Sequence, residues 1–325
     1  MSRPSFDELP LRENDPPFSA WGLYGPNDEL GTLNTLTPEV VREAAKEIQI
    51  GVRVALDHSM TRLVKPSHNR AGLQHVIIPG KKNPTFDDTI HLNTQVSTQW
   101  DGFRHVGYRK SGLFYNGTTK SDIYGPNAST RLGTQAWVSS GGIVGRGVLL
   151  DYVRWSQRQN KSYDLMQNHT ITVDDLQACA DAQNITIRVG DILFVRSGFT
   201  AGYAALSEEE QIAWASKPTA WVGVETSIKT AKWLWDSGIS ACAGDAPGWE
   251  SFPIWCGRSD LGGEEDLSLH EIMLSGWGMP IGEMFDLEKL SQECLNQNRY
   301  SFFVSSMPVH VPGGVGSPPN AVAIF

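Results

Sequence analysis

The amino-acid sequence predicts an α/β fold, and three observations lead to this prediction. Hydrophobic residues make up 40% of the 325 residues, which is enough to bury a large core. Only 19% of the residues are charged, and 32 Gly and 18 Pro indicate many turns, so a loop-rich fold with strands is favoured over a helix bundle. In the second half of the chain, short β-prone runs alternate with amphipathic segments, which is typical of α/β architecture.

The first 37 residues are rich in Pro, Gly, Asn and Asp and are predicted to form an extended arm with turns. Within this arm, the segment 21–34 is expected either to fold near a pocket or to act as a turn-rich brace. A helix is expected from Pro38 to about Gln49, because Thr37 can cap its first turn and proline fits the first helical position. Strands are then expected at 52–56, 76–78 and 89–100, followed by loops to about residue 140.

From residue 143 onwards, the predicted order becomes strand, helix, strand. The expected strands are 143–151, 191–196, 239–243 and 301–304. The expected helices are 173–183, capped by Thr172, and then 207–214, 227–235, 268–274 and 286–296. The glycine-rich segment 141–147 precedes a strand rather than a helix, so it is interpreted as a turn and not as a nucleotide loop. No repeat or low-complexity linker divides the chain, and one catalytic domain, 38–325, is predicted to follow the arm, 1–37.

The balance of charge excludes several classes of partner. The chain has 27 Lys and Arg against 36 Asp and Glu, a net charge of −9, and no basic run is longer than two residues. Nucleic acid and anionic membranes are therefore not expected as partners. No window approaches the ~18 apolar residues of a membrane span, and the polar first 15 residues lack the apolar stretch of a secretory leader, so a cytoplasmic protein is expected. Four scattered cysteines without a CxxC pair are then expected to be buried thiols: Cys179, Cys242, Cys256 and Cys294.

One segment concentrates polar side chains where a strand should be apolar on one face. In an extended chain, residues of equal parity share a face. Six polar residues of the predicted strand therefore point the same way: His91, Asn93, Gln95, Ser97, Gln99 and Asp101. His105 could join them after a turn at Gly102. Taken alone, this stripe is equally consistent with the solvated face of an edge strand and with a functional site.

The stripe also resembles a known signature. The segment TQWDGFRH, ending at His105, resembles the HxGTHxDxPxH signature of the cyclase family, which contains bacterial kynurenine formamidase and isatin hydrolase. Gln95 and Gln99 occupy the first two His positions of that signature. Other segments resemble the family in the same order along the chain: GRGVLLD at 145–151, GDILFVRSG at 190–198, Gly244-Asp245, His270, Glu283 and the closing segment 308–323. The resemblance extends over roughly residues 90 to 325, and its strength lies in this colinearity.

The resemblance implies a mixed, barrel-like β-sheet core surrounded by helices, in a homodimer or homotetramer. In the family, the first two His, the Asp, and the late His and Glu bind one or two divalent metal ions, and the last His of the signature transfers protons. By position, Asp101, His270 and Glu283 are then the candidate metal ligands, with Gln95 and Gln99 at the two remaining ligand positions. The candidate catalytic residues are His105, as the acid/base, with Asp101 and Glu283.

The two glutamines depart from the family pattern and change the expected metal. An amide oxygen is a weaker ligand for zinc than imidazole, so one divalent ion is expected rather than two, with Zn²⁺, Mn²⁺ and Mg²⁺ left open. A second register, which lays HLNTQ at 91–95 on HxGTH, would place Ser97 at the Asp position. The register that ends at His105 is preferred because it keeps both the Asp and the final His, although His91 on the same face could be recruited as a ligand.

The function implied is a metal-dependent hydrolase of an amide, formamide, imide or lactone, similar to the arylformamidases of tryptophan catabolism and acting on a small molecule. Trp100 and Phe103 flank the stripe and are candidate walls for an aromatic substrate, although core packing is the commoner role for any one of eleven Trp residues. Two alternatives stay open: a lyase or cyclase acting on a small aromatic or polyketide-like substrate, and a catalytically silent small-molecule-binding relative that has lost the metal. Histidines 58, 68, 75, 169 and 310 lack companions at ligand spacing and are expected to be surface or packed residues.

Overall fold

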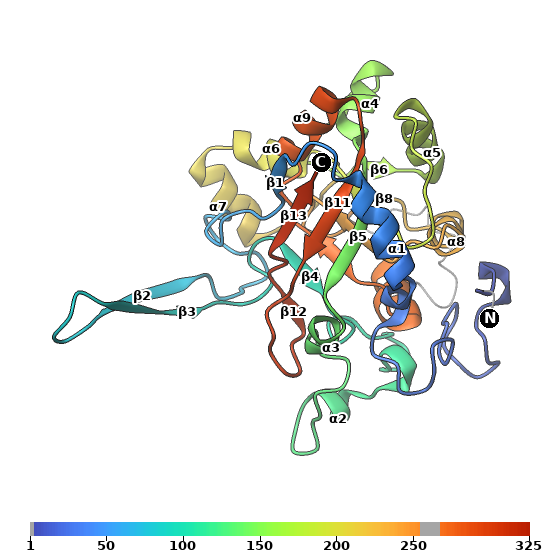
Figure 1. The fold of residues 1–325 in the computed structure, drawn as a ribbon, viewed down its shortest axis with the longest axis horizontal. Coiled ribbons are helices and arrows are strands. Elements are labelled where there is room, and N and C mark those ends of the chain that lie inside the picture. Colours follow the sequence, from blue (N-terminus) through green and yellow to red (C-terminus); the bar gives the residue numbers. More distant parts are fainter. Residues whose placement is uncertain (1–2, 254–266) are drawn as a thin grey trace.

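The computed structural model describes residues 3–253 and 267–325, and it shows a mixed α/β fold around a curled nine-stranded sheet (Figure 1). The strand order is β1-β13-β11-β5-β7-β9-β10-β4-β12. Four neighbouring strands are parallel: β5 (Ile143–Leu150), β7 (Ile192–Val195), β9 (Ala241–Gly244) and β10 (Ile281–Glu283). The flanking strands pair antiparallel: β1 (Arg53–Ala55), β4 (Gln99–Asp101), β11 (Ser301–Ser306), β12 (Gly316–Ser317) and β13 (Ala321–Ile324). The expected mixed, barrel-like sheet is confirmed.

The helices surround this sheet, and several of them agree with the positions expected from the sequence. Five helices lie close to their expected positions: α1 (Pro38–Ala44), α5 (Val173–Ala182), α7 (Glu208–Ser216), α8 (Ile228–Asp236) and α9 (Glu288–Gln297). Thr172 caps α5 as expected, because its hydroxyl accepts a hydrogen bond from the backbone N–H of Asp175. Shorter elements were not predicted: η1 (Phe6–Glu8), η2 (Gly31–Thr35), η3 (Ala45–Glu47), η4 (Tyr115–Gly117), α2 (Lys120–Ile123), α3 (Gln135–Ser139), α4 (Tyr152–Arg158), α6 (Phe199–Ala205), β6 (Thr170–Ile171) and β8 (Gly223–Val224).

The expected strand 89–100 is wrong, because the chain is extended at its two ends but turns between them. Its first part belongs to β3 (Phe86–His91), which pairs only with β2 (Gln74–Pro79) in a hairpin that projects from the body (Figure 1). Its last part is β4, inside the main sheet. His91 therefore faces Gln74 in the exposed hairpin and does not share a strand with Asp101, so its proposed recruitment as a ligand is not supported.

The helix expected at 268–274 is displaced toward the C-terminus and is a π-helix, η5 (Glu271–Trp277), whose residues are all buried. Its hydrogen bonds span five residues, a geometry that is uncommon and often occurs at functional sites. The N-terminal arm braces this helix: the indole of Trp21 donates to Ser275 O at 2.7 Å, and the indole of Trp277 donates to Phe18 O at 2.9 Å. The arm, including Trp21 at the start of the segment 21–34, therefore contacts the element that follows His270.

The arm and the end of the π-helix meet at two glycines. Gly31 adopts φ +53, and a Cβ added there would lie 2.0 Å from Gly278 O. Thr32 adds hydrogen bonds from its hydroxyl to Ser240 O at 2.7 Å and to Gly278 O at 3.2 Å. Only glycine satisfies both the left-handed backbone and the close approach, so these contacts fix the arm against the element that follows His270.

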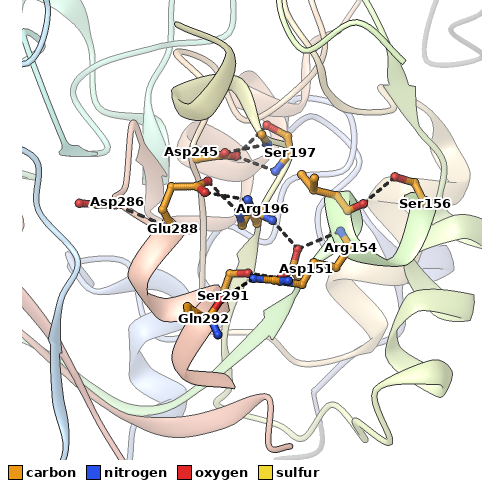
Figure 2. A network of polar contacts seen from close by, with 12 residues as sticks. Asp151, Arg154, Ser156, Arg196, Ser197, Asp245, Asp286, Glu288, Ser291 and Gln292 are labelled. Atoms are coloured by element: carbon orange, nitrogen blue, oxygen red, sulfur yellow. Dashed lines mark hydrogen bonds and ion pairs between the residues drawn. The ribbon is translucent and has the colours of Figure 1, made fainter. Parts of the chain in front are cut away.

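A buried network of ion pairs ties together the carboxyl ends of the central strands (Figure 2). Arg196, directly after β7, donates to Asp151 at 2.9 Å and forms two bonds of 2.8 Å with Glu288 at the start of α9. Asp245, directly after β9, accepts from the backbone N–H groups of Ser197 and Gly198, each at 2.7 Å. These contacts connect three of the segments that carry the family resemblance: 145–151, 190–198 and 244–245. The segments therefore contribute to the structure of the sheet.

Two further expectations concern thiols and membranes. Cys179, Cys242 and Cys294 are buried free thiols, as predicted, whereas Cys256 lies outside the described residues. Within residues 3–253 and 267–325, no helix is both long enough and apolar enough to cross a membrane.

Candidate metal centre and active site

Four elements meet to form a buried polar cluster at one end of the sheet. β4 and β10 pair so that Gln99 lies opposite Glu283, and residues directly opposite on neighbouring strands point to the same face. Asp101 is two residues further along β4 and therefore also points to this face. His270 comes from the turn that opens the π-helix, and Gln95 from the turns that precede β4.

Asp101, His270 and Glu283 are arranged as metal ligands would be. His270 Nε2 lies 3.1 Å from Glu283 Oε1 and 3.7 Å from Asp101 Oδ2, and one ligand atom from each residue lies within 4.8 Å of the others. Asp101 is fully buried, and its Oδ2 has no hydrogen-bond partner among the described residues. A buried carboxylate oxygen without a donor is costly unless a cation or water satisfies it. These residues therefore fit a single divalent ion.

The two glutamines bind the carboxylates of the cluster through their amide N–H groups. Gln95 Nε2 donates to Asp101 Oδ1 at 2.5 Å, and Gln99 Nε2 donates to Glu283 Oε2 at 2.7 Å and to Gln95 Oε1 at 3.1 Å. Each glutamine thus holds one oxygen of a carboxylate. The Oε1 atom of Gln99 is buried and has no partner in the described part of the chain. The expectation that the amide oxygens serve as metal ligands stays a prediction.

Glu250 completes the cluster and was missed by sequence reasoning. Its Oε1 lies 2.8 Å from His270 Nδ1, and its Oε2 accepts from Thr226 Oγ1 at 2.9 Å and from Leu269 N at 2.6 Å. This buried carboxylate fixes the ring of His270 so that Nε2 faces Asp101 and Glu283. Nothing in the segment PGWES around it distinguishes Glu250 from a surface residue, because its partners lie 19 and more residues away.

The cluster shifts the protonation of its members. Burial opposes a charge on His270, but the nearby carboxylate of Asp101 and the hydrogen bonds with Glu250 and Glu283 raise its pKa well above the ordinary value. Burial, and then the charge of Asp101, raise the pKa of Glu283 to about 7, although His270 acts against this. Burial also opposes the charge of Asp101, yet His105 and His270 lower its pKa overall. The three carboxylates of Asp101, Glu250 and Glu283 thus face a single imidazolium, that of His270. The cluster has more negative than positive charge, and a bound divalent cation would offset this excess.

A cavity of about 290 Å³ opens over this cluster. His105 lines it, is partly exposed, and places Nε2 3.8 Å from Asp101 Oδ2. His68, expected to be a surface or packed residue, also lines the cavity. A larger cavity of about 800 Å³ lies between the arm, α1 and β5, but Arg42 is the only charged residue that lines it among those the structure describes. The chemistry of the smaller cavity makes it the candidate active site.

The aromatic walls of the cavity are not the ones expected. Trp100 and Phe103 are 1% and 0% exposed and do not line the cavity. Trp100 packs on Phe285 and donates to Ser306 Oγ at 2.9 Å, while Phe103 packs on Tyr115 and Trp137. Their assignment to substrate binding is therefore wrong: Trp100 alternates with Asp101 along β4 and points to the opposite face, and Phe103 is buried in the turn that follows β4. The rings that do line the cavity are Trp221 and Phe252, stacked with centroids 4.3 Å apart.

The family whose description reads "Putative cyclase" matches residues 32–251, more than half of the chain. The chain belongs to this cyclase family. Among curated protein sequences, none matches it. A solved structure described as a novel cyclase is 28% identical, with a TM-score of 0.82 over 94% of this chain and 99% of that one.

More distant members of the same fold have similar architecture. Isatin hydrolase A from Labrenzia aggregata, bound to benzyl benzoate, is 14% identical, with a TM-score of 0.55 over 90% of this chain and 98% of its own. A predicted metal-dependent hydrolase from Bacillus stearothermophilus is also 14% identical, with a TM-score of 0.50 over 85% of this chain and 98% of its own. At these identities the likeness shows the fold alone. Asp101 and His105 lie inside the family match, whereas His270 and Glu283 lie beyond it.

Proposed function

We propose that this cyclase-family protein is a metal-dependent hydrolase of an amide, formamide, imide or lactone. The observation that carries the proposal is the buried triad of Asp101, His270 and Glu283, in which Asp101 Oδ2 has no hydrogen-bond donor among the described residues. The names of the structural relatives, an isatin hydrolase and a metal-dependent hydrolase, support the same class of reaction.

The residues of the chain have distinct roles in this proposal. Asp101, His270 and Glu283 would hold one divalent ion, which when bound supplies Lewis-acid polarisation of an acyl oxygen and acidifies water. Gln95 and Gln99 orient the carboxylates by donating to the oxygens that face away from His270. Glu250 holds the imidazole of His270 in its tautomer and orientation.

His105 is the proton carrier of the proposed reaction. Its Nε2 lies 3.8 Å from Asp101 Oδ2, at the junction of the buried cluster and the open cavity, where it can pass a proton to a leaving nitrogen or oxygen. Trp221 and Phe252 would pack against a planar substrate and exclude water from one side of it. A lyase or cyclising reaction would use the same His105 and the same cavity.

One observation favours a second candidate, a metal-free binding protein. Gln95 and Gln99 already satisfy one oxygen of each carboxylate with N–H groups, and the raised pKa of His270 supplies a positive charge inside the cluster. Such a protein would bind a small molecule in the same cavity without turning it over.

Metal analysis of protein purified without added metal separates the two candidates. We expect about one divalent ion per chain in the parent, its loss in Asp101→Asn and in His270→Ala, and its retention in Asp191→Asn. Asp191 is the matched control because it is an equally buried carboxylate that pairs with Arg146 instead. Hydrolysis is measured in parallel with formanilide and isatin as probes. A parent that binds no ion, or variants that keep it, would contradict the metal-dependent assignment.

A further inference from the structure

We propose that Arg70 forms an anion-binding subsite at the mouth of the cavity, and that the natural ligand therefore carries a carboxylate. The placement of this carboxylate beside a hydrolysable bond rests on the proposed hydrolase function, whereas the binding of the anion does not. Arg70 lines the same cavity as His105 and Glu283, although it comes from a loop that contributes nothing to the triad.

Most N–H groups of the Arg70 guanidinium have no acceptor among the described residues. Among the described residues it makes no ion pair, and Nη1 donates only a long bond of 3.4 Å to Gln95 O. Arg109, which also lines the cavity, differs: it bonds Glu271 through Nε at 3.1 Å and Nη2 at 3.0 Å. An arginine fork matches the two oxygens of a carboxylate, and a guanidinium beside a buried cluster lacks the solvation it would have on an open surface.

The backbone holds Arg70 in place before any ligand binds. His68 and Asn69 adopt φ 57 and 55, a left-handed pair that is uncommon outside glycine and occurs at ligand-binding sites. Asn93 N donates to Ala71 O at 3.2 Å, which ties this loop to the segment that leads into Gln95. The position of Arg70 relative to the cluster is therefore set by the fold and not by a flexible tip.

The lining of the cavity contains two arginines, Arg70 and Arg109, and three carboxylates, Glu250, Glu271 and Glu283. Arg109 pairs with Glu271, whereas Glu250 and Glu283 contact His270. Within the described residues Arg70 makes no ion pair of this kind, so its guanidinium can attract an anion. The stacked rings of Trp221 and Phe252 on the cavity wall favour a planar ligand, so the expected class is an aromatic carboxylate. Phosphate sites usually gather several backbone N–H groups, and a single arginine fork suits a carboxylate better.

The test compares matched anionic and neutral probes. Binding of anthranilate and benzoate is measured against aniline and benzamide by calorimetric titration, using the full-length protein with the metal content it has on purification. We expect the parent to prefer the carboxylates, and Arg70→Met to weaken their binding roughly ten- to hundredfold while leaving the neutral probes unchanged. Arg70→Lys should restore part of the preference, and higher salt should reduce it.

Arg53→Met is the control, because it removes one positive charge from an exposed strand that does not line the cavity. Equal affinity of the parent for carboxylates and neutral probes, or a preference that survives in Arg70→Met, would overturn the subsite. Because the readout is binding, a protein that prefers carboxylates but hydrolyses nothing would keep the subsite and remove the proposed reaction.

Discussion

Two polar clusters of this molecule are both built around buried carboxylates, but they differ in the cations that balance those carboxylates. In the network of Figure 2, both oxygens of Asp151 accept hydrogen bonds, from Arg196 at 2.9 Å and from Ser291 at 2.5 Å. In the candidate site, Asp101 Oδ2 has no hydrogen-bond partner within the described chain, and three carboxylates share the imidazole of His270. A matched network, in which every carboxylate oxygen has a partner, stabilises the fold without a ligand. An unmatched cluster, with an unpartnered carboxylate oxygen, keeps that oxygen available to bind a ligand or a metal ion.

The largest effect is expected from breaking the matched network. Arg196→Met would remove the 2.9 Å hydrogen bond to the fully buried Asp151, which would keep only the longer ion pair of 3.4 Å with Arg154, and breaking a buried pair typically costs about 3–5 kcal/mol of the free energy of unfolding. Urea-induced unfolding, followed by circular dichroism, gives this value, with Arg53→Met as the exposed control. A loss below about 1 kcal/mol would mean that the network is dispensable. If Arg196→Met fails to fold, Arg196→Lys keeps the charge and allows a smaller loss to be measured.

The unmatched cluster should respond in the opposite way, with a loss of function and little loss of stability. His105→Ala and Asp101→Asn are each expected to lower turnover by at least roughly a hundredfold, the scale for removing a positioned acid/base or a charged ligand. Without metal, Asp101→Asn should lose some stability, because the lowered pKa of Asp101 means that its charge is favoured in the folded state, but less than Arg196→Met loses, because Asn keeps an oxygen that can accept the hydrogen bond from Gln95. Steady-state kinetics and thermal unfolding check the two effects together. Unchanged kinetics in both folded variants would remove the site assignment.

An intermediate effect is expected at Glu250, which positions a ligand without being one. Glu250→Gln keeps a hydrogen-bond acceptor near His270 Nδ1 but removes the charge, and substitutions of this kind typically lower metal affinity about 10- to 100-fold. Competition with a chromogenic chelator measures the affinity, and Glu47→Gln, which alters a carboxylate paired with Arg146 and Arg299, is the control. If both variants hold the metal as tightly as the parent, Glu250 has only a packing role.

The sequence predicted the frame of this molecule better than its site, for physical reasons. Some elements have a local sequence signal that agrees with the folded structure: an apolar run for the strand β5 and a capping threonine for the helix α5. The triad was found through family spacing, and the structure brings its three members together. The strand β10 has only three residues, which is too short for an alternating pattern of polar and apolar residues. Its pairing with β4 therefore could not be predicted from the neighbouring sequence.

Parity along a single assumed strand caused the main errors. It placed His91 with Asp101, although the chain turns between them, and it treated Trp100 and Phe103 as cavity walls, although they are in the core. Glu250 and Arg70 were missed because each acts through a contact with a residue 20 or 25 positions away, which leaves no local pattern. Only the assembled fold shows which carboxylates are matched and which are not.

The smallest effect is expected from converting the glutamines into the histidines of the family signature. Gln95 Nε2 lies 2.5 Å from Asp101 Oδ1, and Gln99 Nε2 lies 2.7 Å from Glu283 Oε2, so imidazoles at both positions would sit beside the two carboxylates. Because imidazole is a stronger zinc ligand than an amide, the double variant Gln95→His plus Gln99→His should bind Zn²⁺ up to about tenfold more tightly. The gain should be modest, since each new imidazole replaces an N–H donor that now holds a carboxylate in place. Chelator competition measures the affinity, and Gln211→His, at a buried glutamine that bonds Tyr203 O, controls for an added histidine. A folded double variant with unchanged zinc affinity would show that these positions only orient the carboxylates, and the unmatched charge of the cluster would then be met by Asp101, His270 and Glu283 alone.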